Sequence, residues 1–238
     1  MSEVNGKIRL INNDYVDKVI LIYDNNIYFH KSASSFLHNR CGSEFTVNAV
    51  SDEKDLFYQI AINENIDTIF IAYHPVWMNT LHSIYKLKKF YPEIRTVVLL
   101  DDPHFPSVVL MRCFEIGIIL SKKDDLECLN SVLDLMPCDY YLSPSFLMNA
   151  NDKNMDRIIR IEKMKRFLTP MERFILAEIF GEKSTSIIAQ ERGCSVKTIY
   201  QHKKNALVKM GFKSLVEIIY LRKGNVFPNE TRNQIHVH

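Results

Sequence analysis

The sequence predicts an α/β domain followed by an all-α domain built around a helix-turn-helix. Up to residue 138, short β-branched runs alternate with amphipathic stretches, the pattern of a doubly wound parallel sheet of five strands. Residues 165–223 instead contain four segments with helical periodicity. A polar, weakly patterned stretch separates the two parts. We therefore expect a sheet domain over 17–138, a linker over 139–164, a helical domain over 165–223 and a flexible tail over 224–238.

The five expected strands are runs rich in Val, Ile and Leu, as in parallel strands that are covered on both faces. They lie at 18–23, 45–50, 68–73, 95–100 and 118–121. The helices between and after them are expected at 28–38, 52–63, 78–90, 107–116 and 126–135. In such sheets, ligands bind at the carboxyl ends of the strands. The positions at those ends are Asp24, Asn25, Ala72, Leu100, Asp101, Ser121 and Lys122.

The helical domain begins with a strong helix-start signal. Thr169 can cap free amide groups, and Pro170 fits the first turn because its missing N–H would be unpaired there anyway. Glu172 completes a capping box with Thr169. Apolar residues then recur at helical spacing until Gly181, where the first helix of the domain ends.

The remaining helices form the helix-turn-helix. A second helix runs from Ser184 to about Arg192, and Ser195 can cap a third helix that runs to Met210. This third helix carries cations that suit phosphates and polar groups that suit base edges, as a helix in a DNA major groove requires. The candidate DNA-binding residues are Lys197, Thr198, Tyr200, Gln201, His202, Lys203, Lys204 and Lys209. A fourth amphipathic helix spans Leu215 to Arg222.

The net charge also differs between the N-terminal and C-terminal parts of the chain. Residues 163–223 hold thirteen Lys and Arg against five Asp and Glu, a formal balance of +8 in a chain whose total is +2. Residues 1–162 hold sixteen against twenty-two, a balance of −6. This distribution indicates that only the C-terminal part meets a polyanion.

Other sequence features narrow the class of protein. The five cysteines are dispersed without CxxC or paired histidine spacing, which favours reduced thiols over a disulfide framework or a zinc site. Neither a signal peptide nor an apolar run of membrane-spanning length is visible. P-loop, GxSxG and HExxH motifs are absent from the sequence. We therefore expect a cytoplasmic protein that is not an enzyme and needs neither a metal nor another cofactor.

The motifs of the helical domain resemble the LuxR/NarL-type DNA-binding domain. They are Leu168-Thr-Pro-x-Glu, Ile188-Ala189, Ser195-Val-Lys-Thr-Ile-x-x-His202 and Lys209-Met210. The family usually has the glycine that ends its first helix one place later, where this chain has Glu182. The resemblance implies that Tyr200, Gln201 and Lys204 face the groove. It also implies dimerisation through the fourth helix, around Leu215, Val216, Ile219 and Tyr220.

The order of strands and helices before residue 138 resembles the receiver domain of NarL/FixJ response regulators. That family has an acidic pair after the first strand, a phosphate-accepting aspartate at the end of the third, and a lysine at the end of the fifth. Here Asp24 and Lys122 stand at two of these positions, but Ala72 occupies the place of the aspartate. Alanine has no carboxylate to accept a phosphoryl group, and a lone Asp24 makes a poor magnesium site. The resemblance therefore implies a pseudo-receiver with a vestigial pocket formed by Asp24, Ala72 and Lys122.

Three accounts of function remain open after these observations. The first is a sequence-specific, DNA-binding transcriptional regulator that works without phosphorylation. The second is an auxiliary regulator that acts as a heterodimer with a phosphorylatable relative, and the third is a ligand sensor of the LuxR type. The partners expected for the first two are double-stranded promoter DNA, a second copy or related regulator, and RNA polymerase.

Overall fold

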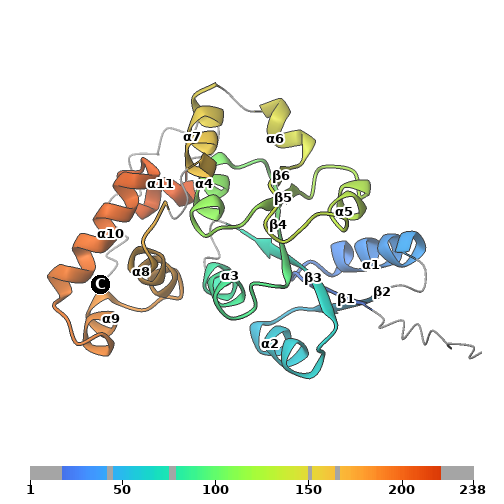
Figure 1. The fold of residues 1–238 in the computed structure, drawn as a ribbon, viewed down its shortest axis with the longest axis horizontal. Coiled ribbons are helices and arrows are strands. Elements are labelled where there is room, and N and C mark those ends of the chain that lie inside the picture. Colours follow the sequence, from blue (N-terminus) through green and yellow to red (C-terminus); the bar gives the residue numbers. More distant parts are fainter. Residues whose placement is uncertain (1–17, 42–44, 75–78, 150–151, 164–166, 221–238) are drawn as a thin grey trace, which may run out of the picture.

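The computed structural model describes residues 18–41, 45–74, 79–149, 152–163 and 167–220 (Figure 1). The expected tail over 224–238 lies outside the described residues. Within the described ranges, no helix combines the length and the apolar character needed to cross a membrane.

The N-terminal part is a parallel sheet in the order β2-β1-β3-β4-β5-β6. Its strands are β1 (Lys18–Tyr23), β2 (Phe45–Val50), β3 (Ile66–Tyr73), β4 (Arg95–Leu100), β5 (Ile118–Ser121) and β6 (Tyr141–Leu142). The predicted parallel α/β architecture is confirmed, and the order of the first five strands is that of a doubly wound, flavodoxin-like sheet.

The prediction of five strands needs correction, because β6 adds a sixth within the segment expected as linker. The Tyr141 N–H donates to the Gly117 carbonyl at 2.8 Å, and the Ser143 N–H donates to the Ile119 carbonyl at 3.2 Å. A strand of two residues is too short to show an alternating pattern in the sequence. The rest of the expected linker also contains helices, so residues 139–164 include regular structure.

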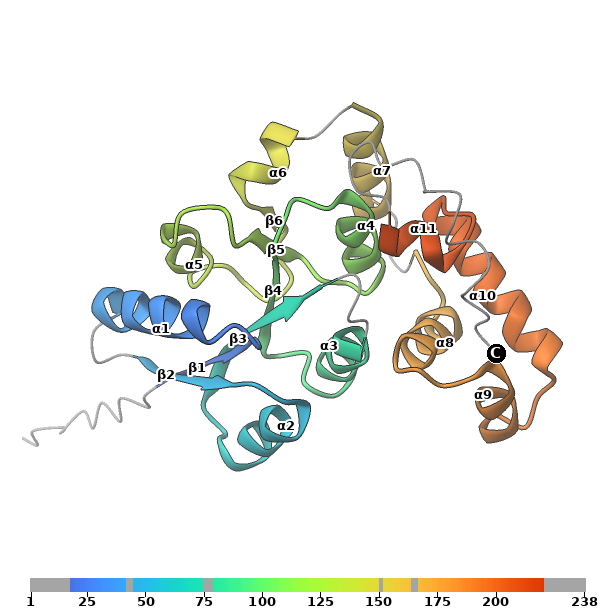
Figure 2. The ribbon, with the colours of Figure 1, turned by 180° about the vertical axis from the view of Figure 1, so that it is seen from behind.

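Helices cover both faces of the sheet and form the C-terminal part (Figures 1 and 2). They are α1 (Ile27–Cys41), α2 (Glu53–Ile62), α3 (Asn79–Phe90), α4 (Phe105–Cys113), α5 (Glu127–Ser131), α6 (Pro144–Asn149), α7 (Asp152–Lys163), α8 (Pro170–Phe180), α9 (Thr185–Glu191), α10 (Val196–Met210) and α11 (Leu215–Tyr220). Buried residues of α1 and α5 share one apolar core with the sheet, while those of α2, α3 and α4 share another. The last helix of the sheet domain is shorter than the expected 126–135.

The helices α8 and α10 begin with the side-chain caps that the sequence predicts. In α8, the Glu172 N–H donates to Thr169 Oγ1 at 3.2 Å and the Thr169 N–H donates to Glu172 Oε2 at 2.8 Å, so the predicted capping box is confirmed. In α10, Ser195 Oγ accepts from the Thr198 N–H at 3.1 Å. Gly211 then ends α10 in the left-handed region at φ 78°.

The turn after α8 contains Glu182, the position at which the resembled family usually has a glycine. Gly181 has an ordinary φ of −80°, whereas Glu182 adopts the left-handed φ of 66°. A Cβ added to Gly181 would lie 2.8 Å from Nδ1 of His82 on α3. The absence of a Cβ at Gly181 thus leaves room for the His82 ring, and Glu182 adopts the left-handed backbone conformation that favours glycine.

The C-terminal helices pack directly on the sheet domain. Figures 1 and 2 show α8 beside α3, and α7 and α11 beside α4. One continuous apolar core runs from the sheet through Phe114 to Leu176 and Phe180 of α8 and Ile218 of α11. A second, small core inside the helical part contains Ile175, Ile188 and Ile199.

Candidate functional site

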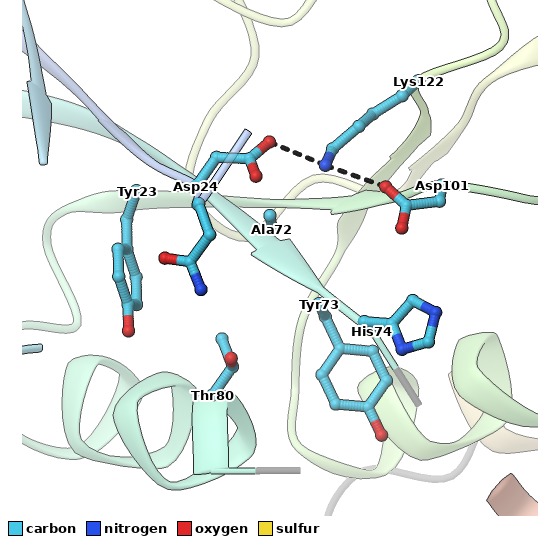
Figure 3. A pocket seen from close by; sticks show the side chains of 9 residues that line it. Tyr23, Asp24, Ala72, Tyr73, His74, Thr80, Asp101 and Lys122 are labelled. Carbon is cyan, nitrogen blue, oxygen red and sulfur yellow. Dashed lines mark ion pairs between the residues drawn. The ribbon is translucent and has the colours of Figure 1, made fainter. Parts of the chain in front are cut away.

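The carboxyl ends of the central strands meet in a pocket (Figure 3). Residues from the ends of β1, β3, β4 and β5 and from the start of α3 line it: Tyr23, Asp24, Asn25, Ala72, Tyr73, His74, Thr80, Asp101 and Lys122. The fold thus brings together the three residues that the sequence assigned to a vestigial pocket, Asp24, Ala72 and Lys122. The methyl group of Ala72 lies between the other side chains and offers no oxygen (Figure 3).

An ion triad lies in this pocket, between the ends of β1, β4 and β5. The Lys122 ammonium lies 2.6 Å from Asp24 Oδ2 and 2.8 Å from Asp101 Oδ1 (Figure 3). Asp24 is 5% exposed, and its Oδ1 accepts the Asn26 N–H at 2.9 Å. The same ammonium lies 5.1 Å from the centre of the Phe29 ring, so aromatic and anionic groups surround it.

Asp101 is the residue of this site whose role the sequence did not reveal. The sequence places Asp101 among the strand-end positions but does not indicate its pairing with Lys122. The signal was its place directly after β4, because carboxyl ends of neighbouring parallel strands share one edge of the sheet. Asp101 supplies the second carboxylate that neutralises Lys122, in the absence of one from residue 72.

Burial keeps the phenols around the pocket neutral. Burial raises the pKa of Tyr23, and the negative charges of Glu53 and Asp52 raise it further. Full burial also raises the pKa of Tyr73.

The charged residues of the pocket lining are Asp24, Asp101 and Lys122. Two carboxylates and one ammonium give the lining a formal charge of −1, which repels anions such as acyl phosphates.

The second candidate site is the outward face of α10. Ile199, Ala206, Leu207 and Met210 are buried against the other helices. Lys197, Thr198, Tyr200, Gln201 and Lys204 are exposed, while His202, Lys203 and Lys209 are partly buried. All eight side chains that the sequence assigned to DNA binding therefore retain some solvent exposure, and they lie on one helix.

The lysines of α10 differ in their contacts. Lys209 donates to Glu172 Oε2 at 2.7 Å and thereby joins the capping box of α8. Lys203 lies over the Tyr200 ring at 5.1 Å from its centre. Within the described part of the chain, the side chains of Lys197 and Lys204 have neither an ion pair nor a hydrogen bond. The ammonium groups of Lys197 and Lys204 are therefore not held by an internal contact among the described residues.

The fourth helix of the C-terminal part, α11, lies against α4 of the sheet domain. Ile218 is fully buried in the shared core, and Leu215 packs against that core. Val216 is 38% exposed. The side chains of Ile219 and Tyr220, which the resemblance assigned to dimerisation with Leu215 and Val216, lie outside the described residues.

The chain resembles solved structures of a bacterial regulator. RcsB from Salmonella enterica serovar Typhimurium, bound to promoter rprA with phosphomimetic BeF3−, superposes with a TM-score of 0.53 at 15% identity, covering 85% of this chain and 96% of that chain. The same protein bound to promoter P1flhDC gives a TM-score of 0.49 at 16% identity, covering 86% and 98%. The first superposition shows a shared fold. No curated protein matches the sequence.

The family model described as bacterial regulatory proteins, luxR family, matches residues 166–221. This range contains the capping box, the turn between α9 and α10 and the exposed face of α10, and it carries an excess of Lys and Arg over Asp and Glu. It is also the range in which the sequence motifs were found. Residues 166–221 of this chain therefore match the luxR family of bacterial regulatory proteins, and they follow a parallel sheet domain, an arrangement whose fold is shared with RcsB.

Proposed function

We propose that this protein is a sequence-specific, DNA-binding transcriptional regulator of the cytoplasm, that it is not an enzyme, and that it acts without phosphorylation of its receiver-like domain. The observation that carries the proposal is the exposed polar and cationic face of α10 within a luxR-family domain. The RcsB structures of similar fold are complexes with promoter DNA, which agrees with this function.

The contacts along α10 suggest a division of roles. Lys197 and Lys204 are exposed without internal partners, so they bind phosphates or base edges most readily. Gln201 and Tyr200 are also exposed and contact the DNA bases, and Thr198 contacts the sugar-phosphate backbone of the DNA. His202 and Lys203 are partly buried and contribute less to DNA binding. Lys209 mainly stabilises the domain, through its ion pair with Glu172.

Independence from phosphorylation is supported by the ion triad. A receiver that is switched by phosphate needs an acceptor carboxylate and a lysine that is available to the new phosphoryl group. Residue 72 is alanine, and Lys122 already lies within 2.8 Å of two carboxylates. The pocket therefore has a single electrostatic state that phosphate donors do not change.

A partner-dependent regulator is the second candidate, and it depends on whether α11 is available for pairing. DNA-binding domains with one reading helix gain affinity by pairing on two half-sites. Leu215 of α11, which the resemblance assigns to dimerisation, packs against the core shared with α4. Pairing through Leu215 of α11, with a second copy or a related regulator, then requires that α11 dissociate from α4. Contact with RNA polymerase remains a prediction from the resemblance.

DNA binding is tested by fluorescence anisotropy of the full chain with duplexes selected from a randomised library, at several salt concentrations. We expect Lys204→Ala to weaken binding and to lower the slope of log affinity against log salt by about one, because one phosphate contact is lost. Lys54→Ala is the matched control, since Lys54 is also exposed but lies on α2. Equal effects of the two substitutions, or the lack of any salt-dependent binding, would refute the proposal.

The independence from phosphate is tested on the same complexes. Incubation with acetyl phosphate and Mg²⁺ is expected to leave both the intact mass and the DNA affinity of the full chain unchanged. A mass increase of one phosphoryl group together with tighter binding would show a different acceptor and overturn this part of the proposal. Tighter binding only after addition of a related regulator would favour the partner-dependent form.

A further inference from the structure

Two amide side chains form a pair on the exposed face of α10. Gln201 Nε2 donates to Asn205 Oδ1 at 2.8 Å, one helical turn further along. Both residues are exposed, and they lie beside Lys204, which has no internal partner in the described structure. Sequence reasoning placed Gln201 in the groove but gave Asn205 no role.

The pair leaves a defined part of the Gln201 amide available. A primary amide has two N–H donors, one on the same side as its carbonyl oxygen and one on the opposite side. The hydrogen bond to Asn205 can use the opposite N–H. The carbonyl oxygen and the remaining N–H then form one edge, whose acceptor and donor match the N6 amino group and the N7 atom of adenine in the major groove.

From this geometry we propose that Asn205 is a positioning residue that holds Gln201 for the recognition of an adenine. The inference rests on the proposed DNA-binding function and adds the base that is read. A free glutamine side chain loses rotamer freedom when it binds, and a partner that already restricts the side chain lowers that cost. Asn205 thus acts on discrimination between bases through Gln201, without touching the base.

A second contact on the same face supports this arrangement. Lys203 lies over the Tyr200 ring, with its ammonium group 5.1 Å from the ring centre. Within the described residues, neither Lys203 nor Asn205 contacts the carbonyl oxygen of Gln201, which therefore stays available to a base. Lys204 supplies the phosphate contact that places the helix, whereas the amide pair supplies base discrimination.

The experiment uses the full chain and duplexes selected from a library with a randomised core. The adenine that Gln201 reads is the position at which Gln201→Ala abolishes the base preference. Replacing that adenine with 7-deazaadenine, which lacks the N7 acceptor, should weaken binding of the unaltered protein but not of Gln201→Ala. The measured quantity is the ratio of affinities for adenine and for the other bases at this one position.

Asn205→Ala is expected to lower that ratio by about two- to ten-fold, the range set by the cost of immobilising one flexible side chain. Asn205→Asp keeps an acceptor oxygen, so the ratio should persist even though the added negative charge weakens binding to every duplex. Val208→Ala is the control, because Val208 is 67% exposed on the same helix. Alanine favours helix, so neither alanine variant endangers the fold of α10.

The outcomes separate this inference from the function on which it rests. Selective loss of adenine discrimination in Asn205→Ala, with retention in Asn205→Asp, supports the positioning role. Sequence-specific binding in which Asn205→Ala behaves like Val208→Ala overturns the inference and leaves the proposed function intact. The absence of any DNA binding by the full chain overturns both.

Discussion

Lys122 stabilises the receiver-like pocket by neutralising a carboxylate that has almost no access to water. Its ammonium lies 2.6 Å from Asp24, which is 5% exposed. Lys122→Ala should therefore lower the free energy of unfolding by about 2–4 kcal/mol, because a buried charge loses its partner and faces Asp101. Urea denaturation followed by circular dichroism measures this change.

Lys123 provides the control for that measurement. It pairs with Asp102, but its side chain is 64% exposed, so Lys123→Ala should change the free energy of unfolding by less than about 0.5 kcal/mol. Equal losses in the two variants would mean that the pocket pair contributes no more than a surface pair.

Asp67 is a second stabilising carboxylate, at the opposite end of the sheet. Its carboxylate lies 2.9 Å from Lys18 and 2.6 Å from Arg95, and it accepts from Thr68 Oγ1 at 2.7 Å. Burial opposes ionisation, but the hydrogen bonds from Lys18 and Thr68 and the charge of Arg95 bring the pKa of Asp67 below its usual 3.8. The carboxylate thus stabilises the fold above pH 3.8, and this contribution is lost as the pH falls through the lower folded pKa.

Asp67→Asn should accordingly lower the free energy of unfolding by about 2–4 kcal/mol at neutral pH, since Arg95 loses its anionic partner. The difference between the original chain and the variant should shrink as the pH is lowered below about 4. Denaturant titrations at neutral and acidic pH test this. A difference that stays constant with pH would exclude the charged form of Asp67 as its source.

At the scale of elements, two substitutions in the turn after α8 should change stability in opposite directions. Glu182 has a left-handed backbone, so Glu182→Gly should raise the free energy of unfolding by up to about 1 kcal/mol. Gly181→Ala should destabilise the chain, because its Cβ would lie 2.8 Å from His82 Nδ1 and displace the His82 ring from its place beside α8. Thermal unfolding of the two single variants tests these opposite signs, and a stabilising Gly181→Ala would contradict the close approach.

At the scale of the whole molecule, the continuous core should make the two domains unfold together. Tyr85 of α3 lies 6.3 Å from the Phe114 ring and 6.5 Å from the Phe174 ring of α8, joining the domains. In the original chain, hydrogen exchange should show α3 and α8 losing protection in one transition with increasing denaturant. Tyr85→Ala should cost about 1–3 kcal/mol and separate the two transitions.

Tyr58→Ala is the control for this substitution, since Tyr58 is 61% exposed on α2. Independent unfolding of α3 and α8 in the original chain would show that the shared core contributes little to domain coupling. The same exchange measurement on the DNA complex would show whether α11 leaves α4 on binding, as pairing through α11 requires.

The sequence by itself determined the elements and their chemistry. Five strands, the capping box of Thr169 and Glu172, and the exposed face of α10 follow from local periodicity and from residue types at fixed spacing. The lack of an acceptor at Ala72 is likewise a property of one side chain. These features depend on neighbours within a turn or a strand, which the order of residues specifies directly.

Only the tertiary structure decided the contacts between distant segments. The pairing of Asp101 with Lys122, the docking of α8 on α3 and of α11 on α4, and the sixth strand all join residues that are far apart in the sequence or too few to form a pattern. Gly181 illustrates the reason: its place in the chain reads as a helix end, but the side chain that excludes a Cβ there, His82, belongs to another domain. Such constraints arise from packing in space, which local sequence patterns do not encode.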